Sequence, residues 1–224
     1  QPNATALLFL SCRDISVSKC RSEIIPLVYT GSNRAGVSAS ADSPSSHYAL
    51  CSSVTAPEHF SWNITVEGNA CHSKYGYDSN DNAIVSSAIT LTYTQYAKVS
   101  NNLIEGYPHG VMFWGGNPAM SGPEPHDGGM STERKCKFIT ISSNLVRDIR
   151  MGGIWGSMGE MISVTGNAVD NCKDVGIDFE GCWSSTAAGN TVRDCNNGCL
   201  ITCFDNRSII FSGNSCSQRF PWSN

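Results

Sequence analysis

Apolar and polar residues alternate in short segments along most of the chain. Ile139–Ile141 and Ile162–Val164 each place one polar residue between two apolar ones. This period of two directs successive side chains to opposite faces of a β-strand, whereas a helix would repeat every three to four residues. The pattern therefore predicts an all-β protein.

The alternating segments recur at a fixed interval. Each repeat contains an asparagine that follows two apolar positions and precedes another, and we call these residues the marker asparagines: Asn69, Asn102, Asn144, Asn167, Asn190 and Asn214. The last four are spaced by 23, 23 and 24 residues, and the wider earlier spacings indicate loops inserted into the same unit. With three strand segments per repeat, the sequence predicts a right-handed parallel β-helix with coils of about 23 residues and three sheets.

Two columns of polar residues have structural interpretations. The marker asparagines are expected at a bend between two sheets, where a left-handed backbone and hydrogen bonds between stacked amides would suit this residue type. Three residues after each marker, the charges alternate in sign along the repeats at Glu105, Arg147, Asp170 and Arg193. This second column predicts stacked ion pairs on an exposed face.

Length and composition favour one domain spanning residues 1–224, with an inserted loop at 115–135. A net charge of -4 provides no basic surface for nucleic acid. The apolar run Ala6–Leu10 is too short for insertion into a membrane and is expected to be a strand. Because the chain begins at Gln1, we expect it to be a fragment of a longer polypeptide.

Eleven cysteines form an odd set, and no pair of CxxC motifs is present. Most of the cysteines are therefore expected to be reduced core residues, because free cysteine behaves as a small hydrophobic residue. No metal site is predicted from this spacing.

The third strand of each coil carries the candidate chemistry. If its first residue points inward, as the apolar character of that position indicates, the second and fourth residues point outward. These outward residues are Met112, Trp114, Trp155, Ser157, Asp178, Glu180, Leu200 and Thr202.

The aromatic members of this outward set predict contact with a glycan. Indole faces stack on the C–H surfaces of sugar rings, and Trp114, Trp155 and Met112 would line such a groove. The alternative is that the insertion at 115–135 or another subunit covers the two tryptophans.

Asp178 and Glu180 are the candidate catalytic pair. Residues two apart on a strand lie about 6.6 Å apart along the backbone, which permits either carboxylate separation used by glycosidases. We assign Glu180 as the acid and Asp178 as the base, with the reverse assignment also open. Both could instead be ordinary solvated carboxylates.

Three further residues are candidates for substrate binding. Glu160 is expected in the turn after the Trp155 strand, His109 precedes Gly110 at the edge of the predicted groove, and His126 lies in the inserted loop. Long loops of solenoids commonly hold binding residues. Each of the three could also have a purely structural or solvated role.

The segment Asp174–Gly181, together with the repeated Gly-Asn-x-Val coils, resembles the β-helices of phage tailspikes and capsule depolymerases in the pectate-lyase-like superfamily. The resemblance covers roughly residues 60–216, and the first ~50 residues fit the repeat poorly. It implies a homotrimer on a virion tail or outside the cell that binds and cleaves bacterial surface polysaccharide, either capsule or O-antigen, without an obligatory cofactor. A glycoside hydrolase is the expected activity.

Two other functions are compatible with the same pattern. A polysaccharide lyase would need a basic residue beside the substrate, and the outward set contains no Lys or Arg. A receptor-binding or structural β-helix would hold the glycan without cleaving it.

Overall fold

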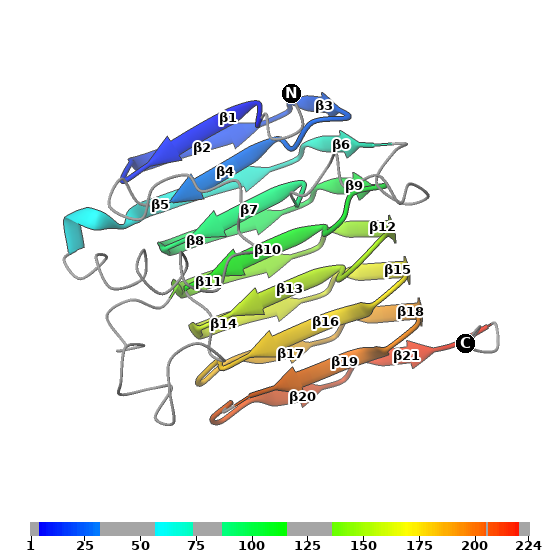
Figure 1. The fold of residues 1–224 in the computed structure, drawn as a ribbon. Coiled ribbons are helices and arrows are strands. Elements are labelled where there is room, and N and C mark those ends of the chain that lie inside the picture. Colours follow the sequence, from blue (N-terminus) through cyan, green and yellow to red (C-terminus); the bar gives the residue numbers. More distant parts are fainter. Residues whose placement is uncertain (1–4, 32–56, 74–86, 116–135, 205, 220–224) are drawn as a thin grey trace.

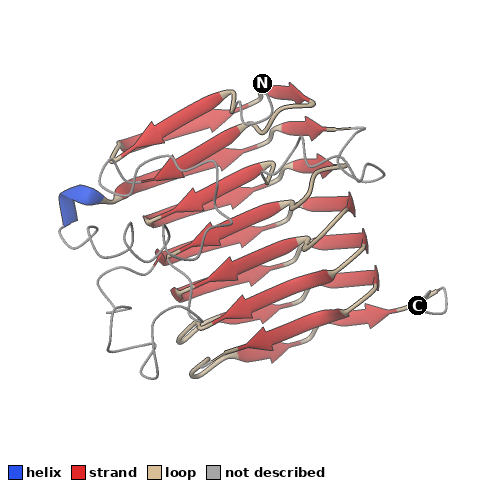
Figure 2. Ribbon diagram, viewed as in Figure 1, coloured by secondary structure: helices blue, strands red, loops and turns tan. Residues whose placement is uncertain are grey.

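The predicted all-β solenoid is confirmed. The computed structural model describes residues 5–31, 57–73, 87–115, 136–204 and 206–219, and these residues form three parallel sheets of seven strands each (Figures 1 and 2). Each turn of the chain adds one strand to each sheet in order, which defines a right-handed parallel β-helix. None of the helical structure in the described residues has the length and apolar character that a bilayer-spanning helix requires.

The first sheet carries the candidate site. Its strands, in spatial order, are β1 (Leu7–Leu10), β4 (Val28–Gly31), β7 (Ile89–Thr92), β10 (Val111–Trp114), β13 (Ile154–Ser157), β16 (Val175–Glu180) and β19 (Gly198–Cys203).

The other two sheets complete each coil. The second contains β2 (Arg13–Ser18), β5 (Ser61–Glu67), β8 (Thr94–Ser100), β11 (Cys136–Ser142), β14 (Gly159–Thr165), β17 (Thr186–Ala188) and β20 (Ile210–Ser212). The third contains β3 (Arg21–Glu23), β6 (Ala70–His72), β9 (Leu103–Glu105), β12 (Leu145–Ile149), β15 (Ala168–Cys172), β18 (Thr191–Cys195) and β21 (Ser215–Ser217). A short 3₁₀ helix, η1 (Pro57–His59), precedes β5.

The N-terminal strands extend the solenoid beyond the part that the repeat pattern covered. Ile15 and Val17 of β2 pair with Ile64 and Val66 of β5 in the same parallel register as the later coils. The predicted strand at Ala6–Leu10 corresponds to β1. The first coil has Cys20 at the position of the marker asparagine, so the sequence pattern could not define its register.

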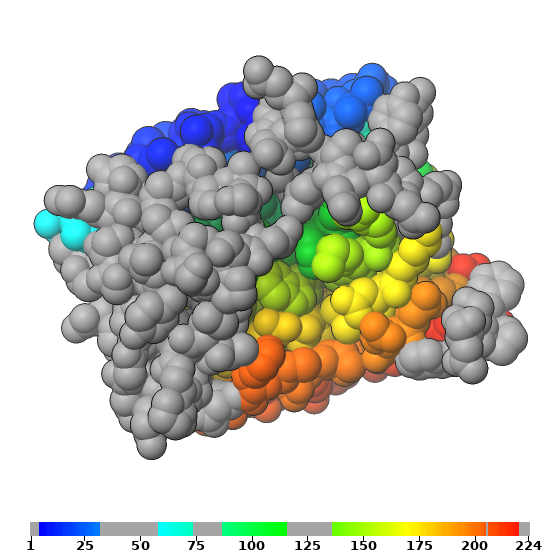
Figure 3. Space-filling view, in the orientation of Figure 1, coloured from blue at the N-terminus to red at the C-terminus, as the bar shows by residue number. Residues whose placement is uncertain are grey.

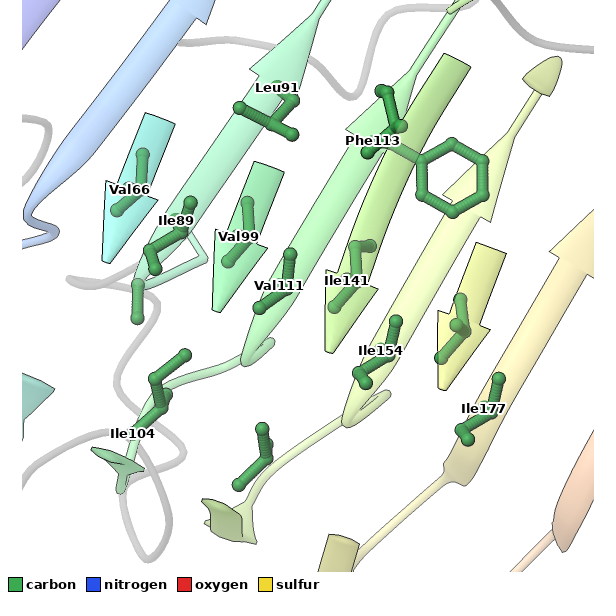
Figure 4. Close-up of a cluster of buried hydrophobic side chains, with 14 of the residues drawn as sticks. Val66, Ile89, Leu91, Val99, Ile104, Val111, Phe113, Ile141, Ile154 and Ile177 are labelled. Atoms are coloured by element: carbon green, nitrogen blue, oxygen red, sulfur yellow. The ribbon is translucent and has the colours of Figure 1, made fainter. Parts of the chain in front are cut away.

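Inward-facing residues of all three sheets form one continuous core. Figure 4 shows the aliphatic columns that alternation predicted, with residues of successive coils stacked along the axis. The described cysteines are free thiols, and five of them are buried: Cys71, Cys136, Cys172, Cys182 and Cys195. Removal of this apolar surface from water is the main force holding the coils together.

The marker asparagines form a buried ladder along the axis. The Asn102 side-chain N–H donates to Asn144 Oδ1 at 3.0 Å, and Asn144 repeats this bond to Asn167 Oδ1 at 3.0 Å. Each amide also donates to a backbone carbonyl, as Asn144 does to Val99 at 3.0 Å. The predicted stacking of amides along the axis is therefore confirmed.

The expectation of a left-handed backbone at the markers is wrong by one position. The left-handed residues are those immediately before the markers: Gly68, Asn101, Ser143, Gly166, Gly189 and Gly213. Glycine tolerates this conformation without steric cost, which explains its frequency at that position. The turn is therefore made before the marker, and the marker itself closes it with hydrogen bonds.

The alternating charges form ion pairs between adjacent coils, as predicted. Arg147 Nη2 lies 3.0 Å from Glu105 Oε2, and Arg193 contacts Asp170 in the same way. Because the Arg147 side chain is 47% exposed, solvent screens the attraction. The column is therefore expected to add little to stability.

Arg147→Ala is expected to lower the free energy of unfolding by less than about 1 kcal/mol, the range of exposed ion pairs. Urea denaturation monitored by circular dichroism measures the change. Lys98→Ala, which removes a comparable exposed pair with Glu67, is the control. A loss above about 2 kcal/mol for Arg147→Ala alone would show that this column stabilises the stack more than exposed pairs do.

Candidate functional site

The outer face of four consecutive strands brings the candidate residues together. Met112 pairs with Trp155 and Trp155 with Asp178, while Trp114 pairs with Ser157 and Ser157 with Glu180. We call this surface the β10–β19 wall, and its residues are Met112, Trp114, Trp155, Ser157, Asp178, Glu180, Ile201 and Cys203. Figure 3 views the molecule from the side of this sheet.

The residues between the wall positions point into the core, as alternation requires. Val111, Phe113, Ile154, Ile177 and Phe179 are all buried in the hydrophobic cluster. Gly156 occupies the core position opposite Phe113, and a Cβ there would lie 1.8 Å from the Phe113 ring. Packing of this ring therefore fixes β10 against β13 beneath the two tryptophans.

The predicted outward residues of the last strand were wrong. Leu200 pairs with Ile177, an inward position, and Ile201 and Cys203 pair with Asp178 and Glu180. The error came from aligning Gly198 with Gly176, whereas Gly198 pairs with Val175. Paired residues of β16 and β19 are 23 positions apart, whereas Gly198 follows Gly176 by 22. An alignment on the two glycines therefore places the outward residues of β19 one position too early.

The aromatic residues of the wall lie next to one another. The Trp114 and Trp155 ring centroids are 5.9 Å apart, and the His109 ring lies 5.5 Å from that of Trp155. Both indoles and Met112 are partly exposed. The two indoles are flat and apolar, and such surfaces suit the face of a sugar ring.

His109 is held by the backbone at the edge of the wall. Its Nδ1 accepts a hydrogen bond from the Gly152 N–H at 3.2 Å. Burial lowers the pKa of His109 to about 4, so the imidazole is neutral near pH 7. As predicted from its position, His109 lies beside the aromatic part of the wall.

The two carboxyl groups occupy different environments on one strand. The Trp155 indole N–H donates to Glu180 Oε1 at 3.2 Å. Asp178 is only 4% exposed, and its Oδ1 has no hydrogen-bond partner among the residues that the structure describes. A buried carboxylate oxygen without a partner is costly, which marks Asp178 as a functional candidate.

Burial and neighbouring charge shift the pKa of both carboxyl groups upward. Desolvation, followed by the charges of Glu180 and Asp174, raises the pKa of Asp178 to about 7. Desolvation also raises the pKa of Glu180, and the Trp155 hydrogen bond opposes this shift. The sequence did not single out Asp174, whose side chain lies at the start of the same coil.

Cys203 is a site residue that sequence reasoning missed. Its Sγ, one carboxylate oxygen of Asp178 and one of Glu180 all lie within 4.8 Å of one another. Cys172 and Cys195 are paired on adjacent coils and are 23 residues apart. The same spacing places Cys203 opposite Glu180, so the two cysteines would have given the correct register. Burial raises the pKa of Cys203, and the nearby carboxyl groups add to the shift.

Two predicted binding residues are not part of this group. Glu160 lies on β14 in the second sheet, where its carboxylate is 3.7 Å from Lys137 Nζ, so the expected position in a turn beside the groove was wrong. Strand β13 of the wall ends at Ser157, and strand β14 of the second sheet begins at Gly159. His126 and all but the first residue of the insertion at 115–135 lie outside the described residues.

The fold and the site define a parallel β-helix with an aromatic and acidic wall on one sheet. A family model described as "Periplasmic copper-binding protein (NosD)" matches residues 59–218. The match spans more than half of the chain, and the chain belongs to this family. No curated protein matches the chain.

The family match confirms the fold that the resemblance to tailspikes implied. Its description names a periplasmic copper-binding protein and gives no support for a phage tailspike. Tailspike identity therefore stays a prediction from the sequence pattern.

Asp178, Glu180 and Cys203 differ from the donor sets that copper(I) favours. Copper(I) favours several soft thiolate or thioether ligands, and imidazole is a common copper ligand. Asp178, Glu180 and Cys203 supply two hard carboxylate oxygens and one sulfur. This donor set does not fit copper(I).

Proposed function

We propose that the β10–β19 wall binds a glycan and that Asp178 and Glu180 hydrolyse one of its glycosidic bonds. One observation carries the proposal: two partly or fully buried carboxyl groups lie on the same strand face as a pair of neighbouring indoles, and one indole donates directly to Glu180. The indoles that would stack on a sugar and the carboxyl groups that would act in catalysis therefore lie on neighbouring strands of one sheet.

The spacing of the carboxyl groups favours a retaining mechanism. Oxygens of Asp178 and Glu180 approach within 4.8 Å, which is closer to the ~5–5.5 Å of retaining glycosidases than to the ~6.5–9.5 Å of inverting ones. In this mechanism one carboxylate attacks the sugar and the other group protonates the leaving oxygen.

The hydrogen bond from Trp155 supports one assignment of the two roles. An N–H donor stabilises the anionic form of its acceptor, which favours Glu180 as the nucleophile. Asp178, which lacks a partner at Oδ1, then serves as the acid. This assignment reverses the first choice made from the sequence and uses the alternative that was left open there.

The substrate class and the location remain proposals. An extended surface polysaccharide, such as a bacterial capsule or O-antigen, suits a wall that continues along several coils. The word "periplasmic" in the family description supports a location outside the cytoplasm. Assembly into a homotrimer is proposed from the resemblance alone.

Incubation of the protein with purified capsules and O-antigens is expected to release oligosaccharides whose masses include one added water per bond cleaved. Mass spectrometry of the products checks this outcome. Unsaturated ends would instead indicate a lyase, which the absence of Lys and Arg from the wall disfavours. Polymers that bind the protein and remain intact across the panel would replace hydrolysis with binding alone.

A further inference from the structure

We propose that Asp178, Glu180 and Cys203 form a binding site for a divalent cation of borderline hardness, with Zn²⁺ as its representative. The inference goes beyond the proposed glycan chemistry and does not depend on it. It rests on the convergence of three ligand types from two adjacent strands.

Strand pairing places the three ligands. Glu180 and Cys203 are direct partners in the pairing of β16 with β19. Adjacent strands lie about 4.8 Å apart, and Asp178 is two residues before Glu180 on the same face. All three ligand atoms lie within 4.8 Å of one another.

The Asp178 side chain provides an independent indication of a ligand. It is 4% exposed, and Oδ1 is buried without a hydrogen-bond donor from the described part of the chain. Buried polar atoms in native proteins almost always have a partner, so this oxygen marks a position where a further group is expected. A cation beside Asp178 would supply that missing interaction and offset the repulsion between the two carboxylates.

The donor set selects the class of cation. Zn²⁺ accepts cysteine sulfur together with carboxylate oxygen and is commonly four-coordinate, so the three side chains leave one position for water or a substrate hydroxyl. Ca²⁺ takes six to eight oxygen ligands and has little affinity for sulfur. A single sulfur is likewise insufficient for the soft environment that copper(I) favours.

Cation binding and hydrolysis would compete for the same oxygens. A bound ion holds both carboxylates as ligands, so neither can donate a proton or attack the substrate. We therefore expect the zinc-loaded protein to be inactive on glycans. Binding is measured without a glycan, so failure of the metal site and failure of the proposed hydrolysis can be distinguished.

Isothermal titration of the chelator-treated chain with Zn²⁺, in the presence of a non-chelating phosphine reductant, tests the site. We expect one ion per chain, with affinity at least about 10-fold lower in Cys203→Ser because a zinc ligand is lost. The control is Cys216→Ser, which alters an exposed cysteine on β21 and should leave the affinity unchanged. Titration with Co²⁺ should also give a thiolate-to-cobalt absorption band in the wild type that is absent from Cys203→Ser.

The site would be refuted if Zn²⁺ did not bind, or if Cys203→Ser and Asp178→Asn bound it as tightly as the wild type. Cys203-dependent binding of Cu⁺ that exceeded the affinity for Zn²⁺ would overturn the assigned cation class. The urea midpoint of each variant is compared with that of the wild type. If Cys203→Ser failed to fold, the wild-type Co²⁺ spectrum would decide, because a spectrum without the thiolate band rejects Cys203 as a ligand.

Discussion

Asp178→Asn and Glu180→Gln are each expected to reduce glycan cleavage by about 10²–10⁴-fold, the range for loss of a positioned acid–base group. Both substitutions preserve side-chain size but remove the ability to exchange a proton or to attack the sugar. Glycan affinity should change little, because Trp114 and Trp155 provide the stacking surface. Product formation is measured by mass spectrometry, and binding by quenching of tryptophan fluorescence.

Glu160→Gln provides the matched control for these two variants. Glu160 is also a partly buried carboxylate, but it lies on the second sheet beside Lys137. Its substitution should leave the cleavage rate within a few-fold of that of the wild type. Equal losses for Glu160 and the wall residues would indicate a general effect on folding, and undiminished cleavage by Asp178→Asn would exclude Asp178 as the acid.

The sequence predicted the solenoid because its signals are local and repeated. Alternation identifies a strand, and the recurrence of Asn144, Asn167 and Asn190 identifies the coil. Once the coil is known, Trp155 and Asp178 must be neighbours, since they occupy the same position on successive turns. The shared wall follows from spacing alone.

Other parts of the site depend on information that the repeat pattern does not contain. The position of Cys203 required the register of β19, and the glycine used for the alignment had shifted by one residue. The hydrogen bond from Trp155 to Glu180 depends on side-chain orientation, which alternation does not define. Glu160 was misplaced because the boundary between two sheets falls within a few residues of it.

Asp178 differs from the exposed charge column in the groups that surround its carboxylate. Arg147 and Glu105 pair across coils and satisfy each other. Asp178 is instead buried beside another carboxyl group, and within the described ranges its Oδ1 is unpaired, an arrangement that opposes folding. The stability that permits this arrangement must come from the core and from the asparagine ladder.

Asn144→Ala is expected to lower the free energy of unfolding by about 2–4 kcal/mol, because it interrupts the ladder at its centre. Asn144 Oδ1 accepts from both the backbone and the side-chain N–H of Asn102. Its own amide donates to the Val99 carbonyl and to Asn167. Truncation to alanine leaves the buried Asn102 backbone N–H without this acceptor, which is costlier than loss of an exposed hydrogen bond.

Urea denaturation of Asn144→Ala beside Asn197→Ala isolates the contribution of the ladder. Asn197 is an asparagine that donates one exposed hydrogen bond to Asp174 at 2.6 Å, and its replacement should cost less than about 1 kcal/mol. Similar urea midpoints for the two variants would mean that the stacked amides stabilise the fold no more than one exposed hydrogen bond does. A selective loss for Asn144→Ala would show that the buried amides stabilise the stacked coils, and thereby the strands that hold Asp178 and Glu180 together.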